Sequence, residues 1–389
     1  MKVNTRYEEM DSLRGIAATS VVLAHISIIL LGGNIFEKLN YTPLHIFWLG
    51  HESVILFFIL SGFVLSLPYL AKKQVNYKDY IIRRVCRILI PSAISVLNCI
   101  LLMNLLYYKE ISELSKWFNY IWSKPITIQL FIEHLFLLAE TDTMTLNPVL
   151  WSLIHEMRIS ILFPLIMFTV LKREWKWNLV FMFSIPVLFL LTYYFLLKFF
   201  HYDITRFTGY SSYLMTPHYS AFFILGIILA KYRNVISVFY KRLNRVIKVS
   251  FLAIGFVAYM YVWLIMPNKS MFHSFIINDW AIAFGGSIFI IFSLNSKTIK
   301  AALLFKPVNF VGKISYSLYL YHMIVILSMT YILHEILSFE MILAISFVLS
   351  FIVASIMYYA VEFPSIKLGH LLIRSSLKTN VQTEKAKVS

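Results

Sequence analysis

The sequence predicts an all-α polytopic membrane protein with about ten transmembrane helices and both termini in the cytoplasm. Of the 389 residues, 59% are hydrophobic and 14% are charged, whereas soluble domains are about 45–50% apolar and about 25% charged. Apolar stretches long enough to cross a bilayer recur along the chain. Most Lys and Arg residues fall in alternate connections between these stretches, and connections of this kind face the cytoplasm.

Ten stretches are apolar over enough residues to span a hydrocarbon core of about 30 Å. A shorter stretch, 126–139, contains Glu133 and His134, and we expect it to be re-entrant or interfacial. Counting it as a further span would reverse every later connection and lose the charge bias. We expect the Glu362-Phe363-Pro364 sequence to end the last span. The predicted spans are 12–31, 47–70, 87–107, 148–171, 177–198, 214–231, 249–267, 276–294, 314–334 and 340–361.

Composition and charge exclude several classes of protein. The net charge is +16, but the basic residues lie between apolar spans and form no block with aromatic residues, so we expect no nucleic-acid partner. Two cysteines, Cys86 and Cys99, are too few for a disulfide scaffold or a zinc site, and no metal site is predicted. We assign 1–373 to a single membrane domain and 374–389 to a basic cytoplasmic tail that we expect to be disordered.

The first apolar stretch carries an arginine and a histidine on one face. Arg14 and His25 are eleven residues apart, which separates them by roughly 16 Å along a helix axis. The guanidinium then lies at a membrane surface, the imidazole lies about halfway into the core, and Asp11 shares their stripe. A ligand with an anionic end and a long arm, such as coenzyme A, fits this arrangement. The alternative is a surface arginine with a packed core histidine, but ionisable groups inside a membrane are usually functional.

Two further motifs precede the third span. Phe-Phe-x-Leu-Ser-Gly-Phe-x-x-Ser includes Ser61 and Gly62, where glycine allows close helix contact or leaves room for an acyl arm. Arg83, Arg84 and Arg87 follow on the predicted inner side. Arginine binds phosphate oxygens bidentately, although the ordinary charge bias of cytoplasmic connections also predicts arginines there.

The fourth span begins with Trp-Ser-Leu-x-x-Glu, which contains Trp151, Ser152 and Glu156. Ser152, His155 and Glu156 share a helix face. A buried carboxylate at Glu156, in the outer half of the membrane, can orient a histidine, accept a hydrogen bond from a sugar hydroxyl or pair with Arg158.

The ninth span begins with Ser-Tyr-Ser-Leu-Tyr-Leu-x-His, which places Ser315, Tyr319 and His322 on one face. Together with Asp-x-x-Arg-Gly-x-Ala and the following His25, these motifs resemble, in order, those of the membrane acyltransferase-3 family over about residues 7–365. Members of this family are multi-spanning O-acyltransferases that modify bacterial surface glycans and some other acceptors.

The resemblance implies an O-acyltransferase of the bacterial inner membrane that moves an acyl group from cytoplasmic acyl-CoA to a hydroxyl of a surface or lipid-linked glycan. Acetyl-CoA is the expected donor, with succinyl and larger groups left open, and membrane lipids and glycan-assembly proteins are the expected partners. His25 is the candidate general base, although an acyl-histidine route stays open. The implied roles are catalysis by His25 and Glu156, coenzyme A binding by Arg14, Arg83, Arg84, Arg87, Ser61 and Gly62, and acceptor binding by Asp11, Trp151, Ser152, Tyr319 and His322.

A transporter or flippase for a lipid-linked glycan is the alternative function, because it too needs polar groups at mid-depth and a hydrated pathway. The ordered motifs and the absence of an evident inverted repeat favour the enzyme.

Overall fold

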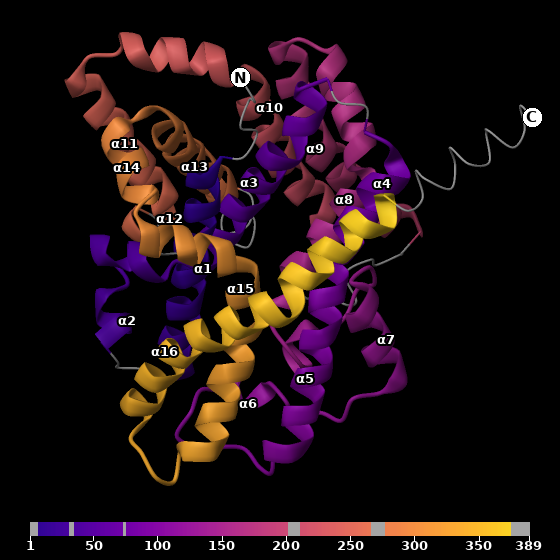
Figure 1. Cartoon of the computed structure of the whole chain (residues 1–389), viewed down its shortest axis with the longest axis vertical. Helices are drawn as coiled ribbons and strands as arrows, with labels where there is room; N and C mark the ends of the chain where they lie inside the picture. Colours follow the sequence, from indigo (N-terminus) through magenta and orange to yellow (C-terminus); the bar gives the residue numbers. More distant parts are fainter. Residues whose placement is uncertain (1–6, 31–34, 73–74, 201–210, 266–276, 375–389) are drawn as a thin grey trace, which may run out of the picture.

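Helices that are far apart in the sequence pack side by side at the centre of the structure, where α1 lies against α15 and α3 against α10 (Figure 1). The computed structural model describes residues 7–30, 35–72, 75–200, 211–265 and 277–374. Its α-helices are α1 (Glu8–Ile29), α2 (Ile35–Leu39), α3 (Gly50–Leu70), α4 (Tyr77–Arg84), α5 (Ile90–Leu106), α6 (Lys116–Tyr120), α7 (Ile128–Phe136), α8 (Leu150–Lys172), α9 (Trp175–Phe200), α10 (Met215–Arg242), α11 (Arg245–Tyr259), α12 (Tyr261–Leu264), α13 (Asn278–Asn295), α14 (Lys297–Leu303), α15 (Lys306–Leu333) and α16 (Phe339–Met357).

The all-α polytopic class is confirmed, with fewer spanning helices than the ten expected. Within the described residues, eight helices are long and apolar enough to cross a membrane, or nine if α13 and α14, bent by 93°, form one broken span. The expected span at 249–267 is instead divided between α11, which has 15 residues, and the four-residue α12. The stretch 126–139 contains only the nine-residue α7, too short to span. The side on which each terminus lies stays a prediction.

Two spans contain a π-helical turn. Val85–Leu89 joins α4 to α5, and Tyr358–Glu362 continues α16 into a helix that reaches Arg374. The expectation that Glu362-Phe363-Pro364 marks the end of a helix is therefore wrong. A proline lacks the N–H that a regular helix needs, but the widened turn before it already interrupts the regular hydrogen-bond ladder. Beyond Arg374, the predicted tail lies outside the described residues.

Close glycine contacts hold α1 against α15 and α3 against α10. A Cβ atom at Gly15 would lie 2.6 Å from the backbone nitrogen of Gly312, so α1 and α15 touch through their backbones. His25 and His322 each lie ten residues beyond these glycines and also meet. The two helices therefore run side by side in the same direction, for roughly 15 Å between the glycine contact and the histidine contact.

The connection between α5 and α8 is tied to the end of α1. The Ser115 amide donates to the Ile29 carbonyl at 2.9 Å, and Leu30 pairs with Leu114 in an isolated β-bridge. The Asn119 side chain closes the loop before α6, because its amide group donates to the Ile111 carbonyl and its oxygen accepts from the Ile111 amide. These contacts place α6 next to the last turn of α1.

Candidate active site

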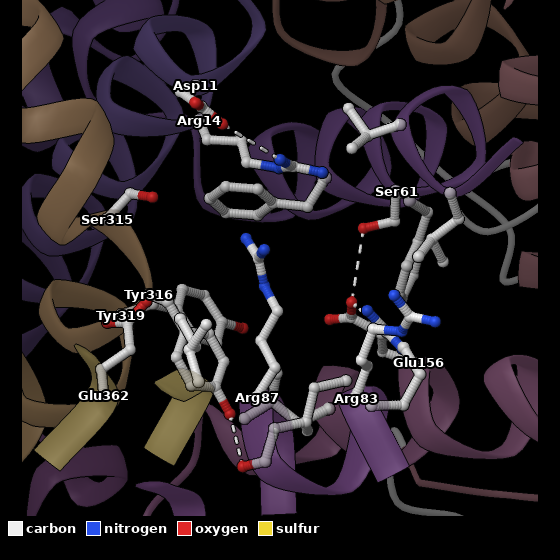
Figure 2. Close-up of a pocket in the computed structure, with 18 of the residues that line it drawn as sticks. Asp11, Arg14, Ser61, Arg83, Arg87, Glu156, Ser315, Tyr316, Tyr319 and Glu362 are labelled. Atoms are coloured by element: carbon white, nitrogen blue, oxygen red, sulfur yellow. Dashed lines mark hydrogen bonds and ion pairs between the residues drawn. The ribbon is translucent and has the colours of Figure 1, made fainter. Parts of the chain in front are cut away.

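A cavity of about 690 Å³ lies between α1, α3, α8, α15, the α4–α5 helix and the continuation of α16 (Figure 2). It brings together side chains from helices at both ends of the sequence. Polar side chains from every predicted motif reach its wall. The site residues predicted from the sequence that line it are Asp11, Arg14, Ser61, Arg83, Arg84, Arg87, Ser152, Glu156 and Tyr319.

The cationic groups of this cavity differ in how they are paired. Arg14 contacts Asp11 at 3.5 Å, and the Arg83 Nε atom donates to the Asp79 carbonyl at 3.2 Å. Arg87 projects from the π turn into the cavity toward Arg14 (Figure 2) and has neither a hydrogen bond nor an ion pair with any described residue. Two guanidinium groups that face one space without an anion between them repel each other, so this part of the cavity suits an anionic ligand.

Arg84 and Glu156 form an ion pair in the wall. An Arg84 nitrogen lies 2.8 Å from a Glu156 carboxylate oxygen, and the two side chains are only 7% and 19% exposed. Ser160 accepts a hydrogen bond from Arg84 at 3.0 Å, and Ser61 donates to Glu156 at 3.4 Å. Arg158, the partner considered for Glu156 from the sequence, donates instead to the Leu138 carbonyl at 2.8 Å. Glu156 therefore lies with the arginines, and Arg84 is held by the protein itself.

His25 and His322 form a hydrogen-bonded pair. The His322 Nδ1 atom lies 3.0 Å from the Leu318 carbonyl oxygen, which can only accept, so Nδ1 carries the proton. Its Nε2 atom must then accept from Nδ1 of His25, which lies 2.9 Å away. This tautomer leaves Nε2 of His25 with a lone pair that can take a proton. The Trp117 ring of α6 stacks on His25, with centroids 5.5 Å apart and an interplanar angle of 11°.

The cavity stops one helical turn before this pair. Neither His25 nor His322 belongs to its lining, whereas Tyr319 does, and the rings of Tyr319 and His322 lie 6.2 Å apart. The expected channel between Arg14 and the imidazole is thus interrupted in this structure at Tyr319.

Gly62, Trp151 and His155 also lie away from the cavity. A Cβ atom at Gly62 would overlap the main-chain oxygen of Phe223 on α10, so this glycine serves helix packing and faces no ligand space here. The Trp151 ring lies near Tyr219, with centroids 5.7 Å apart. The face shared by Ser152 and Glu156 does not extend to His155, whose Nδ1 atom contacts the Thr216 hydroxyl at 2.9 Å.

The polar lining residues that were not predicted as site residues include Lys313, Tyr316 and Glu362. The buried Glu362 carboxylate accepts a 2.6 Å hydrogen bond from Ser317, and the Tyr316 hydroxyl donates to the Ile88 carbonyl in the π turn at 2.9 Å. An acidic residue inside an apolar stretch is itself a signal of function, so Glu362 could have been found. Neither Lys313 nor Tyr316 carries such a signal.

A second polar cluster, consisting of His51, His218 and Asp279, joins the N-terminal ends of α3, α10 and α13. Asp279 is fully buried, and its two carboxylate oxygens lie 2.6 Å from His51 and 3.0 Å from His218. A buried carboxylate needs such partners. Asp279 and His218 were not singled out in the sequence, because the three residues come together only through tertiary packing.

The comparison with known families confirms the family that the motifs resemble. The acyltransferase domain model of the acyltransferase-3 family matches residues 7–359. Neither a curated protein nor a solved structure shows a significant match to the chain. Since the family model covers nearly all of the helical domain, the chain belongs to the acyltransferase-3 family and is a multi-pass membrane acyltransferase.

Proposed function

We propose that this protein is an O-acyltransferase that moves an acyl group, with acetyl the first candidate, from cytoplasmic acyl-CoA to a hydroxyl of a surface or lipid-linked glycan. The observation that carries the proposal is the cavity into which Arg14, Arg83 and Arg87 project. Phosphate groups of a coenzyme A thioester would supply the anion that Arg87 lacks among the described residues, and they could also bind Arg14 and Arg83. The bacterial inner membrane is the proposed location, in keeping with the apolar helices.

The proposed reaction uses His25 as the general base. The acceptor hydroxyl oxygen attacks the thioester carbonyl carbon while Nε2 of His25 takes the hydroxyl proton. The carbon–sulfur bond then breaks, sulfur leaves with the electron pair, and the proton on His25 passes to the thiolate. The products are an ester and free coenzyme A, with no net uptake of protons. His322 holds His25 in the tautomer that this step needs.

Binding of labelled acetyl-CoA to the purified protein tests the donor. We expect saturable binding that Arg87→Ala and Arg14→Ala each weaken by at least tenfold, since a charge-assisted hydrogen bond contributes about 1.5–3 kcal/mol. Arg242→Ala is the matched control, because Arg242 is exposed at the end of α10 and lies outside the cavity lining. Competition by adenosine 3′,5′-bisphosphate would place the nucleotide end at the arginines.

The same measurement separates an enzyme from a transporter. A lipid-linked glycan carrier has no need of coenzyme A, so wild-type protein that binds no acetyl-CoA would contradict the proposal and favour transport. For the acceptor, we expect surface glycan of the host to lose its O-acyl groups when His25→Ala replaces the wild type. Normal O-acylation with the variant present in the membrane would show that His25 is not the base.

A further inference from the structure

The place where the cavity ends is defined by two hydroxyl groups. Along α15 the lining extends from Gly312 to Tyr319, and the next residue on this face, His322, lies outside it. Along α8 the lining ends at Ser152. The Tyr319 and Ser152 oxygens lie 2.7 Å apart, and both residues are only 5% exposed. These two hydroxyls, called here the hydroxyl pair, stand between the arginine cavity and the histidines.

We propose that the hydroxyl pair binds the carbonyl oxygen of the acyl thioester and stabilises the negative charge that develops on it, while the Tyr319 ring separates the donor cavity from His25. This inference rests on the proposed function. It assigns Tyr319 and Ser152 to the reacting carbonyl of the donor, whereas the sequence pointed to the acceptor.

The present partners of the hydroxyl pair show what it can bind. Each hydroxyl lies 3.2 Å from the main-chain carbonyl oxygen of Val149. Because the two oxygens also lie 2.7 Å apart, one hydroxyl donates to the other, and the hydrogen of that other hydroxyl faces the Val149 carbonyl. Because each hydroxyl has one rotatable hydrogen, one can turn to a second carbonyl in the cavity while the other continues to donate to Val149. Little reorganisation is needed at the moment of reaction, which is the condition for effective oxyanion stabilisation.

The chemistry of the proposed transfer needs hydrogen-bond donors next to the reacting carbonyl oxygen. When the acceptor oxygen bonds to the thioester carbon, the carbonyl π electrons move to oxygen and a tetrahedral oxyanion forms. His25 has already taken the hydroxyl proton, and it returns that proton to sulfur when the carbon–sulfur bond breaks. The Arg84 guanidinium is held by Glu156 and Ser160, so it is occupied elsewhere. The hydroxyl pair lies one helical turn from the histidines and can donate to the oxyanion.

The ring of Tyr319 also has a role that its hydroxyl does not. It packs edge-on against Phe57, with centroids 5.6 Å apart, and lies 6.2 Å from the His322 ring. A closed ring wall keeps water away from a bound thioester until the acceptor arrives, and excluding water suppresses hydrolysis. Removal of the ring and removal of the hydroxyl should therefore have different effects.

Tyr319→Phe tests the hydroxyl. With [¹⁴C]acetyl-CoA and host membranes as the source of acceptor, we expect base-labile label in the carbohydrate fraction to appear about 100-fold more slowly, as for loss of one oxyanion donor. The affinity for acetyl-CoA should stay within twofold of the wild type, which also shows that the variant is folded. Tyr321→Phe is the matched control, since Tyr321 contacts Asn98 and lies outside the lining. Transfer by Tyr319→Phe within threefold of the wild type would overturn the proposal.

Two more variants separate the parts of the proposal. Ser152→Ala should slow transfer by at least tenfold with unchanged acetyl-CoA affinity. Tyr319→Ala should raise acetyl-CoA hydrolysis in the absence of acceptor by at least tenfold, whereas Tyr319→Phe should not. Unchanged hydrolysis by Tyr319→Ala would contradict the separating role of the ring. Wild-type protein that binds no acetyl-CoA would instead contradict the proposed function, and this inference with it.

Discussion

The Nδ1 atom of His25 lies 2.9 Å from the Nε2 atom of His322, although 297 residues separate them in the sequence. The carbonyl of Leu318 fixes the proton on the far side of His322, so the hydrogen-bond chain runs from His25 through His322 to the backbone. The order of donors and acceptors in this chain leaves Nε2 of His25 unprotonated. In the proposed mechanism the two imidazoles therefore act as one base, with His25 reacting and His322 orienting it.

Changes to the two histidines should have effects that do not add. We expect His25→Asn to slow acyl transfer by about 10³-fold, in the range for loss of a general base. His322→Phe, which removes the acceptor for Nδ1 of His25, should slow it by about 100-fold. The double variant should be no slower than His25→Asn alone, because residues that act as a unit are non-additive. Transfer rates and acetyl-CoA affinity are measured together, and the affinity should not change. A double variant slower by the product of both factors would show that the histidines act independently.

The buried pair of Arg84 and Glu156 predicts an asymmetric effect on stability. Glu156→Ala leaves the Arg84 guanidinium in the wall without its counter-charge, which should lower the free energy of unfolding by about 3 kcal/mol. The double variant Arg84→Met with Glu156→Met removes both charges and should recover most of this loss. Arg87→Met serves as the control, because Arg87 has no ion pair within the described residues. Unfolding in detergent gives the free energy of unfolding of the wild type and of these three variants. A double variant less stable than Glu156→Ala would contradict this account.

The arrangement of residues along single helices could be predicted from the sequence. The spacing of Arg14 and His25, and the stripe that ends at His322, depend only on the 3.6-residue period of one helix. Both predictions agree with the structure in placing these residues along α1 and α15, which run in the same direction. Hydropathy likewise identified the main spans, because a helix in lipid must be apolar over its length.

Contacts between helices could not be predicted in the same way. The partner of Glu156 is Arg84 on a different helix, 72 residues away, and nothing in the period of α8 distinguishes it from Arg158. The π turn that presents Arg87 leaves no trace in hydropathy, because one extra residue in a turn does not change the composition of a span. Asn119 and Ser115 fix a loop by hydrogen bonds to backbone groups, and a sequence pattern does not specify those partners.

Gly62 gives a direct test of packing against ligand binding. Because a Cβ atom there would overlap the Phe223 main-chain oxygen on α10, Gly62→Ala should separate α3 from α10 and reduce the amount of folded protein at least fivefold. Gly286→Ala is the control, since its Cβ would meet the Leu56 side chain at an ordinary 3.4 Å. Fluorescence-detected size-exclusion chromatography measures the folded fraction. If Gly62→Ala folded normally and only acetyl-CoA binding fell, a ligand role for Gly62 would be supported.

Trp117 was also not predicted from the sequence, and its contact with His25 predicts a kinetic effect. The two rings are nearly parallel, and the end of α1 is tied to the loop that carries Trp117 through Ser115 and Leu114. His25 is thus held by a hydrogen bond on one side and by an aromatic face on the other. An aromatic pair contributes about 0.5–1.5 kcal/mol beyond burial, which corresponds to a change of about two- to tenfold in rate if the contact orients the base.

We therefore expect Trp117→Leu to slow acyl transfer about fivefold with unchanged affinity for acetyl-CoA, and Trp117→Phe, which keeps a flat ring, to retain most of the activity. Trp175→Leu is the matched control, because Trp175 on α9 is 51% exposed and remote in sequence from the site. Transfer from labelled acetyl-CoA, measured at saturating donor, isolates the orienting effect from binding. If leucine and phenylalanine at position 117 gave equal rates, the ring would have no orienting role, and the hydrogen bond to His322 alone would have to fix the direction in which His25 presents Nε2.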